Sequence, residues 1–219
     1  MAGILFIISA PSGSGKSTLV SQLRTLVAGL EFSVSYTTRP PRGSEVDGEA
    51  YHFTTREEFE RMIAAGDFLE WAEVFGNYYG TAVSALEHAK AAGKDLLLDI
   101  DVQGAVQVMK KLPEAISIFI LPPNPQVLQM RLRNRSKAEQ MTSEMVIESR
   151  LAEAQNELKQ IWDYKYALVN DVLDQAAAEM RAIVLSERGE DDEVRSIAAS
   201  CRTDAASSRL KTVLQTFEN

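Results

Sequence analysis

A strand-length apolar run followed by a turn of small residues constrains this chain more than any other feature. Residues 4–18 read Ile-Leu-Phe-Ile-Ile-Ser-Ala-Pro-Ser-Gly-Ser-Gly-Lys-Ser-Thr, and helical spacing continues after them. A buried strand, a glycine-containing loop and a helix start in this order are typical of a P-loop, whose backbone N–H groups bind phosphate. We therefore predict a nucleotide polyphosphate as ligand, with Lys16 at the β- and γ-phosphates and the Ser17 hydroxyl on Mg²⁺.

One position departs from the usual P-loop pattern, because Ala10 stands where that pattern opens with glycine. The alternative interpretation is that Gly-Lys-Ser occurs here by chance. The apolar run before the loop and the helical spacing after it favour the P-loop. The residues that we assign to the nucleotide on this basis are Ala10, Pro11, Ser12, Gly13, Ser14, Gly15, Lys16, Ser17 and Thr18.

Alternating strand and helix patterns predict the fold class. Strands buried on both faces of a parallel sheet read as continuous apolar runs, and four such runs are present, at 4–8, 96–100, 116–121 and 166–169. The helical patterns that alternate with them lie near 16–28, 82–92, 103–111, 124–135, 143–161 and 172–187. The chain is therefore predicted to be an α/β protein with a P-loop NTPase-type parallel sheet flanked by helices.

Segment 32–81 breaks this alternation. It contains short strands interrupted by polar residues (32–35 and 50–53), one helix (55–65) and several turn signals. We predict a mixed α/β lobe inserted over the carboxyl edge of the sheet, because α/β proteins bind their ligands there.

Two later segments are also irregular. Residues 131–143 are basic and polar between two helical patterns, which suits a mobile lid. Beyond Arg188, an acidic stretch at 189–193 is interpreted as a solvated linker, and residues 194–217 form only a weak helical pattern. We expect an appended helix or a partly disordered tail there.

Composition and charge exclude several classes of protein. A net charge of −8 over 219 residues argues against a general binder of nucleic acid or of anionic membranes. The single cysteine, Cys201, excludes an internal disulfide and fits a reducing compartment. The apolar run at 3–8 is too short to span a bilayer, and no basic segment precedes it. We expect a cytoplasmic protein, compatible with a homo-oligomer but not requiring one.

A pair of arginines follows the short strand predicted at 32–35. Tyr-Thr-Thr-Arg-Pro-Pro-Arg places Arg39 and Arg42 three residues apart in a loop stiffened by proline. Two guanidinium groups held in this way can clamp one phosphate through bidentate hydrogen bonds. A pair of solvated surface arginines is an equally good interpretation of this segment taken alone.

Several motifs in order along the chain carry a family resemblance. They are Ala-Pro-Ser-Gly-Ser-Gly-Lys-Ser, Ser-Val-Ser-Tyr-Thr-Thr-Arg-Pro-Pro-Arg, Phe-Leu-Glu-Trp-Ala-Glu-Val-Phe-Gly-Asn-Tyr-Tyr-Gly-Thr, Leu-Asp-Ile-Asp-Val-Gln-Gly and Ile-Phe-Ile-Leu-Pro-Pro. Over about residues 3–187 the chain closely resembles guanylate kinase, and bacterial members of that family commonly carry alanine at the position of Ala10.

The resemblance implies a division into parts as well as an activity, the ATP-dependent phosphorylation of GMP and dGMP to the diphosphate. The kinase domain would span 2–187 and be followed by a C-terminal extension at 188–219. Within it, the implied parts are a core of 2–34, 82–124 and 162–187, a GMP-binding lobe of 35–81 and a lid of 125–161.

The resemblance also implies the roles of the GMP-pocket residues. Those that would hold the phosphate of GMP are Arg39, Arg42, Tyr51 and Tyr79. Those that would face the guanine are Ser35, Glu70, Thr81 and Asp101. A carboxylate such as Glu70 can accept from both N1–H and the 2-amino group of guanine, whereas adenine would leave it unpaired, and unpaired buried groups give strong discrimination.

Asp99 and Asp101 end the second apolar run, at the edge of the sheet that the P-loop shares. Asp99 is therefore a candidate to hold Mg²⁺ through its water shell. Which of the two serves the metal and which serves the base stays open. Capping of the helix that follows is the structural alternative for this pair.

Basic residues in the predicted lid complete the site. Arg131 and Arg135 are four residues apart and would share a helical face. The resemblance implies that these two and Arg150 close over the triphosphate as catalytic residues together with Lys16 and Arg39, and that Asn170 lies near the adenine of ATP. The chain departs from the family at Asn134-Arg135-Ser136, where Gly-Arg-Gly is common, and at Val172, where an aspartate is usual.

Two other functions stay open as alternatives. Guanylate-kinase-like domains also serve as non-catalytic scaffolds, but the intact Gly15-Lys16-Ser17 and the lid arginines argue against that. A kinase of similar architecture could act on a different small phosphate acceptor, but Glu70 with Ser35 and Thr81 argues against that. The sequence thus predicts an enzyme with GMP or dGMP and ATP as substrates and Mg²⁺ as metal.

Overall fold

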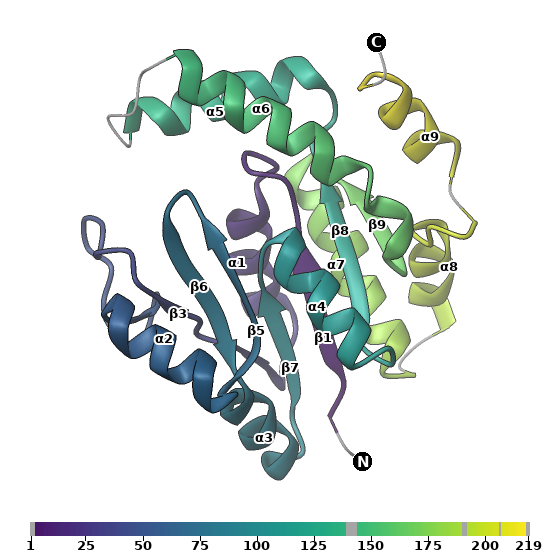
Figure 1. Cartoon of the computed structure of the whole chain (residues 1–219). Helices are drawn as coiled ribbons and strands as arrows, with labels where there is room; N and C mark the ends of the chain where they lie inside the picture. The colour runs from purple at the N-terminus through teal and green to yellow at the C-terminus, as the bar shows by residue number, and fades with distance from the viewer. Residues whose placement is uncertain (1–2, 139–143, 190–191, 206, 218–219) are drawn as a thin grey trace. The chain divides into compact units, whose positions relative to one another are not determined.

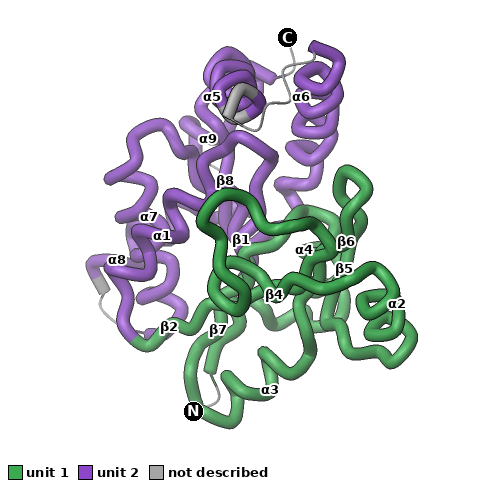
Figure 2. The backbone as a smooth tube through the Cα atoms, turned by 90° about the vertical axis from the view of Figure 1, so that its left-hand side faces the viewer, with its two compact units in different colours: residues 1–7, 29–115 green, residues 8–28, 116–219 purple. Residues whose placement is uncertain are grey.

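The structure is a computed structural model in which residues 3–138, 144–189, 192–205 and 207–217 are described. It contains two compact units, coloured separately in Figure 2. Unit 1 consists of residues 1–7 and 29–115, and unit 2 of residues 8–28 and 116–219. The boundary between them falls inside the first strand, β1 (Leu5–Ser9).

The larger sheet has the strand order β2-β7-β1-β8-β9. The strands of unit 1 in this sheet are β2 (Leu30–Phe32), β7 (Asp95–Asp99) and the start of β1, and β2 pairs with β7 in parallel. Those of unit 2 are the end of β1, β8 (Ile116–Leu121) and β9 (Tyr166–Val169), and β8 pairs with β9 in parallel. Every residue of β8 and β9 is buried, as expected for parallel strands covered on both faces.

Helices flank this sheet (Figure 1). The helices of unit 1 are α2 (Arg56–Ala65), α3 (Val83–Ala92) and α4 (Val102–Lys111). Those of unit 2 are α1 (Lys16–Leu26), α5 (Pro125–Ala138), α6 (Glu144–Leu158), α7 (Leu173–Glu187), α8 (Asp192–Ser200) and α9 (Ser208–Gln215), with a short 3₁₀ turn at Ile161–Asp163. The predicted parallel sheet flanked by helices is confirmed.

A second sheet of unit 1 forms most of the segment that interrupts the alternation. Its strand order is β4-β3-β6-β5, with β3 (Tyr36–Thr37), β4 (His52–Phe53), β5 (Phe68–Val74) and β6 (Asn77–Ala82). The hairpin β5–β6 turns at Phe75 and Gly76, whose φ angles of 50° and 78° are those of a primed turn that matches strand twist. Helix α2 begins after Thr55, whose hydroxyl accepts from the N–H of Glu58.

The strand predictions for the 32–81 segment are wrong in detail. The strand expected at 32–35 lies at Leu30–Phe32 and belongs to the larger sheet, which therefore has five strands and not four. Only His52 and Phe53 of the strand expected at 50–53 are in strand conformation. The sequence analysis missed β5 and β6 altogether.

The irregular lid predicted at 131–143 is also wrong over the part that the structure describes. Helix α5 continues to Ala138, because Leu128 and Leu132 lie one turn apart and are buried against Ala154 of α6. Residues 139–143 of that prediction lie outside the described residues. Beyond residue 191, two helices, α8 and α9, take the place of the single helix or disordered tail expected at 194–217.

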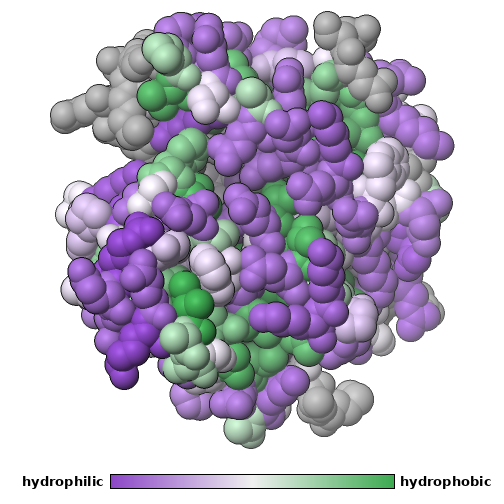
Figure 3. Space-filling view, viewed as in Figure 1, coloured by the Kyte–Doolittle hydropathy of each residue, from purple (hydrophilic) through white to green (hydrophobic). Residues whose placement is uncertain are grey.

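Polar side chains cover most of the face seen in Figure 3, where the apolar ones gather in small areas. None of the helices in the described ranges has the length and hydropathy needed to cross a membrane.

Candidate active site

The P-loop of unit 2 has the geometry that the sequence predicts. Ser14 N–H donates to the carbonyl of Pro11 at 3.1 Å, and α1 begins directly after Gly15, which has a φ of 86°. No side chain caps this helix start within the described part of the chain. A helix start of this kind directs backbone N–H groups and the positive end of the helix dipole toward an anion.

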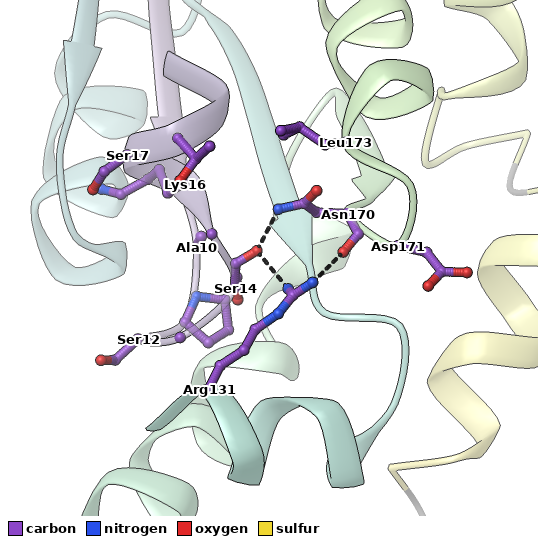
Figure 4. Close-up of a pocket in the computed structure, with 13 residues that line it drawn as sticks. Ala10, Ser12, Ser14, Lys16, Ser17, Arg131, Asn170, Asp171 and Leu173 are labelled. Carbon is purple, nitrogen blue, oxygen red and sulfur yellow. Dashed lines mark hydrogen bonds between the residues drawn. The ribbon is translucent and has the colours of Figure 1, made fainter. Parts of the chain in front are cut away.

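A hydrogen-bond network ties this loop to α5 and to the end of β9 (Figure 4). Asn170 Nδ2 and Arg131 Nη1 both donate to the carbonyl oxygen of Ser14, at 2.8 and 3.2 Å, and Arg131 Nη2 donates to the carbonyl oxygen of Asn170 at 3.1 Å. A Cβ at Gly15 would lie 2.3 Å from Asn170 Nδ2. Only glycine combines this close approach with a positive φ.

The network borders a pocket of about 480 Å³ in unit 2. Its lining residues are Ala10, Pro11, Ser12, Gly13, Ser14, Gly15, Lys16, Ser17, Thr18, Arg131, Asn170, Asp171 and Leu173. All nine predicted loop residues, Asn170 and Arg131 thus surround one cavity. The buried Ser14 hydroxyl has no hydrogen-bond partner within the described residues, so the pocket holds polar capacity that a bound ligand can use.

Of the two further lid arginines, Arg150 is not among the described residues that line this pocket. Arg150 in α6 is 4% exposed, and its Nη1 donates to the Ser136 hydroxyl of α5 at 3.3 Å. Arg135 lies in α5, and its side chain falls outside what the structure describes. Their proposed catalytic roles stay predictions.

In unit 1, two of the residues predicted to face guanine, Glu70 and Thr81, lie on adjacent strands. Glu70 of β5 pairs in register with Thr81 of β6, and Ser35 directly precedes Tyr36, which pairs with Gly80. Glu70 is 2% exposed, and Thr81 is fully buried with an Oγ1 that has no partner among the described residues. A buried carboxylate next to a hydroxyl without a described partner is a polar site that can bind a ligand with hydrogen-bond donors.

Helix α4 approaches the Glu70 carboxylate closely. A Cβ at Gly104, in the first turn of α4, would lie 2.3 Å from Glu70 Oε2. Asp101 caps this helix, since its Oδ1 accepts from the N–H of Gly104 at 2.9 Å. The capping alternative therefore holds for Asp101, whose contact with guanine stays a prediction.

The residues predicted to hold the GMP phosphate also gather in unit 1. Arg39 is 7% exposed, and its Cζ lies 5.3 Å from the centre of the Tyr51 ring. The rings of Tyr51 and Tyr79 are 5.9 Å apart, edge to face. Arg42 is exposed in the loop that follows. The pair of arginines is therefore unlike two solvated residues, because one of them is buried.

Glu45 holds the buried arginine in place, a contact that the sequence analysis missed. Its two carboxylate oxygens accept from Nη1 and Nη2 of Arg39, each at 3.0 Å, and Oε2 also accepts from the backbone N–H of Arg42 at 2.7 Å. The signal in the sequence is a glutamate three residues after Arg42 across a Gly-Ser turn, in which Glu45 N–H donates to the Arg42 carbonyl.

This ion pair shifts the pKa values of both partners. Burial acts to lower the pKa of Arg39, but hydrogen bonds to Glu45 and Tyr79 raise it above its usual value. The hydrogen bond from Arg39 lowers the pKa of the Glu45 carboxyl below its ordinary range. Both groups are therefore charged at neutral pH.

Comparison with known proteins decides the family. Residues 3–187 match the family model described as guanylate kinase. A guanylate kinase of Koribacter versatilis is 50% identical over the whole of this chain and 97% of its own length, and one of Shewanella oneidensis is 50% identical over 85% of this chain and 88% of its own. The chain belongs to the guanylate kinase family.

A solved structure agrees with this assignment. The crystal structure of guanylate kinase from Anaplasma phagocytophilum has a TM-score of 0.67 and 32% identity, covering 91% of this chain and 95% of that one. Guanylate kinases phosphorylate GMP to GDP with ATP, so this member of the family is a kinase that binds nucleotides.

Magnesium, which the P-loop implies, fits the chemistry of two residues of this guanylate kinase. Ser17 is exposed and lines the pocket of unit 2, and Asp99 is partly buried at the end of β7 in unit 1. A hydroxyl and a carboxylate are the hard oxygen ligands that Mg²⁺ prefers. No cluster of three histidine, cysteine or acidic residues that could hold a metal occurs in the residues that the structure describes.

Sequence reasoning also missed two pocket residues. Asp171 and Leu173 line the cavity beside Asn170. The position of Asp171 two residues beyond the end of β9 could have indicated this, since ligand-contacting loops follow the carboxyl ends of parallel strands.

Proposed function

We propose that this guanylate kinase transfers the γ-phosphoryl group of ATP to GMP, and less rapidly to dGMP, by in-line displacement. ATP would bind in the pocket of unit 2, with Asn170 near its adenine, and GMP in the 35–81 lobe of unit 1. The observation that carries the proposal is Glu70, a carboxylate buried beside the unpartnered hydroxyl of Thr81. Guanine offers two donors to such a carboxylate, and adenine offers none in that arrangement.

The reaction in this proposal requires alignment and not deprotonation. A phosphate oxygen of GMP is already ionised at neutral pH and can attack without a general base. The P-loop N–H groups and Lys16 would bind the triphosphate, and Arg39 and Arg42 with Tyr51 and Tyr79 would hold the attacking phosphate. When Mg²⁺ is bound, it neutralises charge on the phosphates of ATP. Ser17 and Asp99 are the residues proposed to hold it.

The lid would act on the donor. Arg131 already contacts the loop carbonyl of Ser14, and Arg135 and Arg150 lie on the same pair of helices, α5 and α6. We infer that segment 125–161 closes over the triphosphate and excludes water, which would otherwise hydrolyse ATP. We also expect the protein to act in the cytoplasm and to bind no nucleic acid.

A coupled assay of ADP formation with GMP, dGMP, AMP and a phosphorylated sugar tests this function. GMP is expected to give the highest kcat/KM, dGMP a lower one, and AMP a value lower by about 10⁴-fold. Equal turnover of AMP and GMP would exclude the proposed role of Glu70. Turnover of the sugar phosphate alone would favour the alternative acceptor.

A further inference from the structure

The C-terminal extension lies beyond the residues that match the family model, and nothing so far gives it a role. Its described residues, 192–205 and 207–217, are called the C-terminal strap below. They contain α8 and α9, which belong to unit 2 and follow α7 in the chain (Figure 1). The strap contacts the rest of unit 2 at four places.

The first two attachments secure it to α7 and β9. Val194 of α8 packs with Ala182 and Leu185 of α7. Further along, residues 201–203 run beside β9, the last strand of the sheet: Ala167 N–H donates to the Cys201 carbonyl at 2.8 Å, and an antiparallel bridge joins Tyr166 to Arg202. An edge strand with free backbone groups is a liability, and the strap covers it.

The third attachment reaches the strand end that carries Asn170. Arg209 of α9 donates from Nη1 to Glu179 Oε1 at 2.9 Å and from Nη2 to the carbonyl oxygen of Val169 at 3.3 Å. Val169 immediately precedes Asn170, whose side chain hydrogen-bonds the P-loop carbonyl of Ser14.

The fourth attachment reaches the helices of the lid. Phe217 packs against the cluster formed by Leu128 and Leu132 of α5 and Ala154 of α6. The same leucines adjoin the P-loop, because a Cβ at Gly13 would lie 3.1 Å from each of them. Arg131, the other donor to the Ser14 carbonyl, lies on α5 between the two leucines.

We propose that the C-terminal strap is a working part of the ATP site, in which Arg209 and Phe217 are positioning residues for Asn170 and Arg131. Each supports one of the two side chains that hydrogen-bond the Ser14 carbonyl. The inference rests on the proposed function, because it requires ATP to bind in the pocket of unit 2. ATP binding and docking of the strap are then coupled. Bound ATP must favour the docked strap by the same free energy by which the docked strap favours ATP binding.

Steady-state kinetics of Phe217→Ala test the proposal, with Lys211→Ala as the matched control. Lys211 is an exposed residue of α9, the helix that ends two residues before Phe217. Phe217→Ala is expected to raise KM for ATP about 3- to 10-fold while KM for GMP stays unchanged, since such supporting contacts change coupling by this order. Lys211→Ala should change neither. If the residue only stabilises the fold, Phe217→Ala lowers the melting temperature and the active fraction but leaves KM for ATP unchanged. That result overturns the proposal.

Arg209 offers an independent test at the other end of the strap. Arg209→Ala is expected to raise KM for ATP, and Arg209→Lys to restore part of the loss, because lysine keeps the charge facing Glu179 but lacks the planar fork that also reaches Val169. Equal KM values for ATP in all three proteins contradict the role of Arg209.

Cys201 supplies a readout that does not depend on activity. It is the only cysteine of the chain, it is 5% exposed within the strap, and burial raises the pKa of its thiol to about 11. Its alkylation therefore requires local opening of the strap. A non-hydrolysable ATP analogue should slow alkylation of the wild-type protein several-fold, whereas GMP should not.

Calorimetric titration of the same samples separates the two ways in which this experiment can fail. If the analogue binds and the alkylation rate is unchanged, the strap is not coupled to the ATP site and the inference is wrong. If the analogue binds equally well to wild type and to Lys16→Ala, the P-loop pocket is not the ATP site, which contradicts the proposed function and, with it, this inference.

Discussion

The proposed acceptor and donor sides of this kinase hold their arginines with different kinds of partner. In unit 1, Arg39 is paired with the Glu45 carboxylate through both terminal nitrogens. In unit 2, Arg131 donates to the carbonyl oxygens of Ser14 and Asn170. A carboxylate neutralises the charge of its arginine, and its own charge depends on pH. A backbone carbonyl does not neutralise the arginine, and its charge does not change with pH.

This difference predicts different behaviour of the two sides. The Arg39–Glu45 pair has little net charge. The binding free energy of an incoming phosphate is therefore expected to come more from hydrogen bonds to the guanidinium and the nearby tyrosines than from attraction to an unpaired cation. The Arg131 contacts leave the positive charge uncompensated by those partners, which suits the more highly charged triphosphate. Four predictions test the comparison, in order of expected effect.

Lys16→Ala tests the donor side and should have the largest effect. Loss of the cation at the β- and γ-phosphates is expected to lower kcat by at least about 10³-fold. KM and Kd for GMP should be nearly unchanged, because the residues proposed to bind GMP lie in unit 1. Steady-state kinetics and calorimetry with GMP measure both quantities, and full activity of the variant would show that the P-loop assignment is wrong.

Glu70→Gln tests the acceptor side. Removing the charged acceptor of two guanine donors should lower kcat/KM for GMP by about 10²-fold. The amide can donate to adenine N1, so the ratio of GMP to AMP activity should fall further. Glu73→Gln is the matched control, since Glu73 is exposed on the same strand. Unchanged discrimination in Glu70→Gln would mean that the base is read elsewhere.

Glu45→Gln tests the support of Arg39 without touching the substrate residues. The amide keeps the shape but loses the charge that fixes the guanidinium and the Arg42 backbone. KM for GMP should rise about 10-fold, and KM for ATP should not change. Equal increases in both KM values would show that the pair stabilises the whole fold instead.

The same pair predicts a small effect of pH on stability. Arg39 lowers the pKa of Glu45 in the folded protein, so the pair adds stability above the ordinary glutamate pKa of about 4.3 and loses it as the pH falls through the folded value. Wild type should exceed Glu45→Gln by up to about 1 kcal/mol in unfolding free energy at neutral pH. Urea titrations should show this difference shrinking as the pH falls below the ordinary glutamate pKa of about 4.3; a difference that does not change with pH would contradict it.

The sequence predicted best what depends on long apolar runs and on local motifs. The strands at β7, β8 and β9 and the P-loop lie within a residue or so of their expected positions, because continuous burial leaves a clear pattern. Strand β2 was misplaced because it has three residues, one of them Glu31 in an ion pair with Lys94. Its membership of the sheet depends on long-range pairing with β7.

Contacts between distant segments could not be read from the sequence. In Phe68–Val74, exposed Trp71 and Glu73 alternate with buried Glu70 and Ala72, a strand signal that the sequence analysis did not use. The role of Glu45 depends on the fold of its loop around Arg39. That of Phe217 depends on a cluster whose nearest buried member in the chain, Ala154, is 63 residues away. Such partners become visible only when the side chains are placed.

The central claim is that GMP and ATP are recognised by different units of the chain. Calorimetric titration of GMP and of a non-hydrolysable ATP analogue into Glu70→Gln and Lys16→Ala tests it most directly. The account predicts that Glu70→Gln binds GMP weakly and the ATP analogue normally. It predicts that Lys16→Ala binds the ATP analogue weakly and GMP normally. Loss of both ligands in one correctly folded variant, or loss of GMP binding in Lys16→Ala, would contradict it.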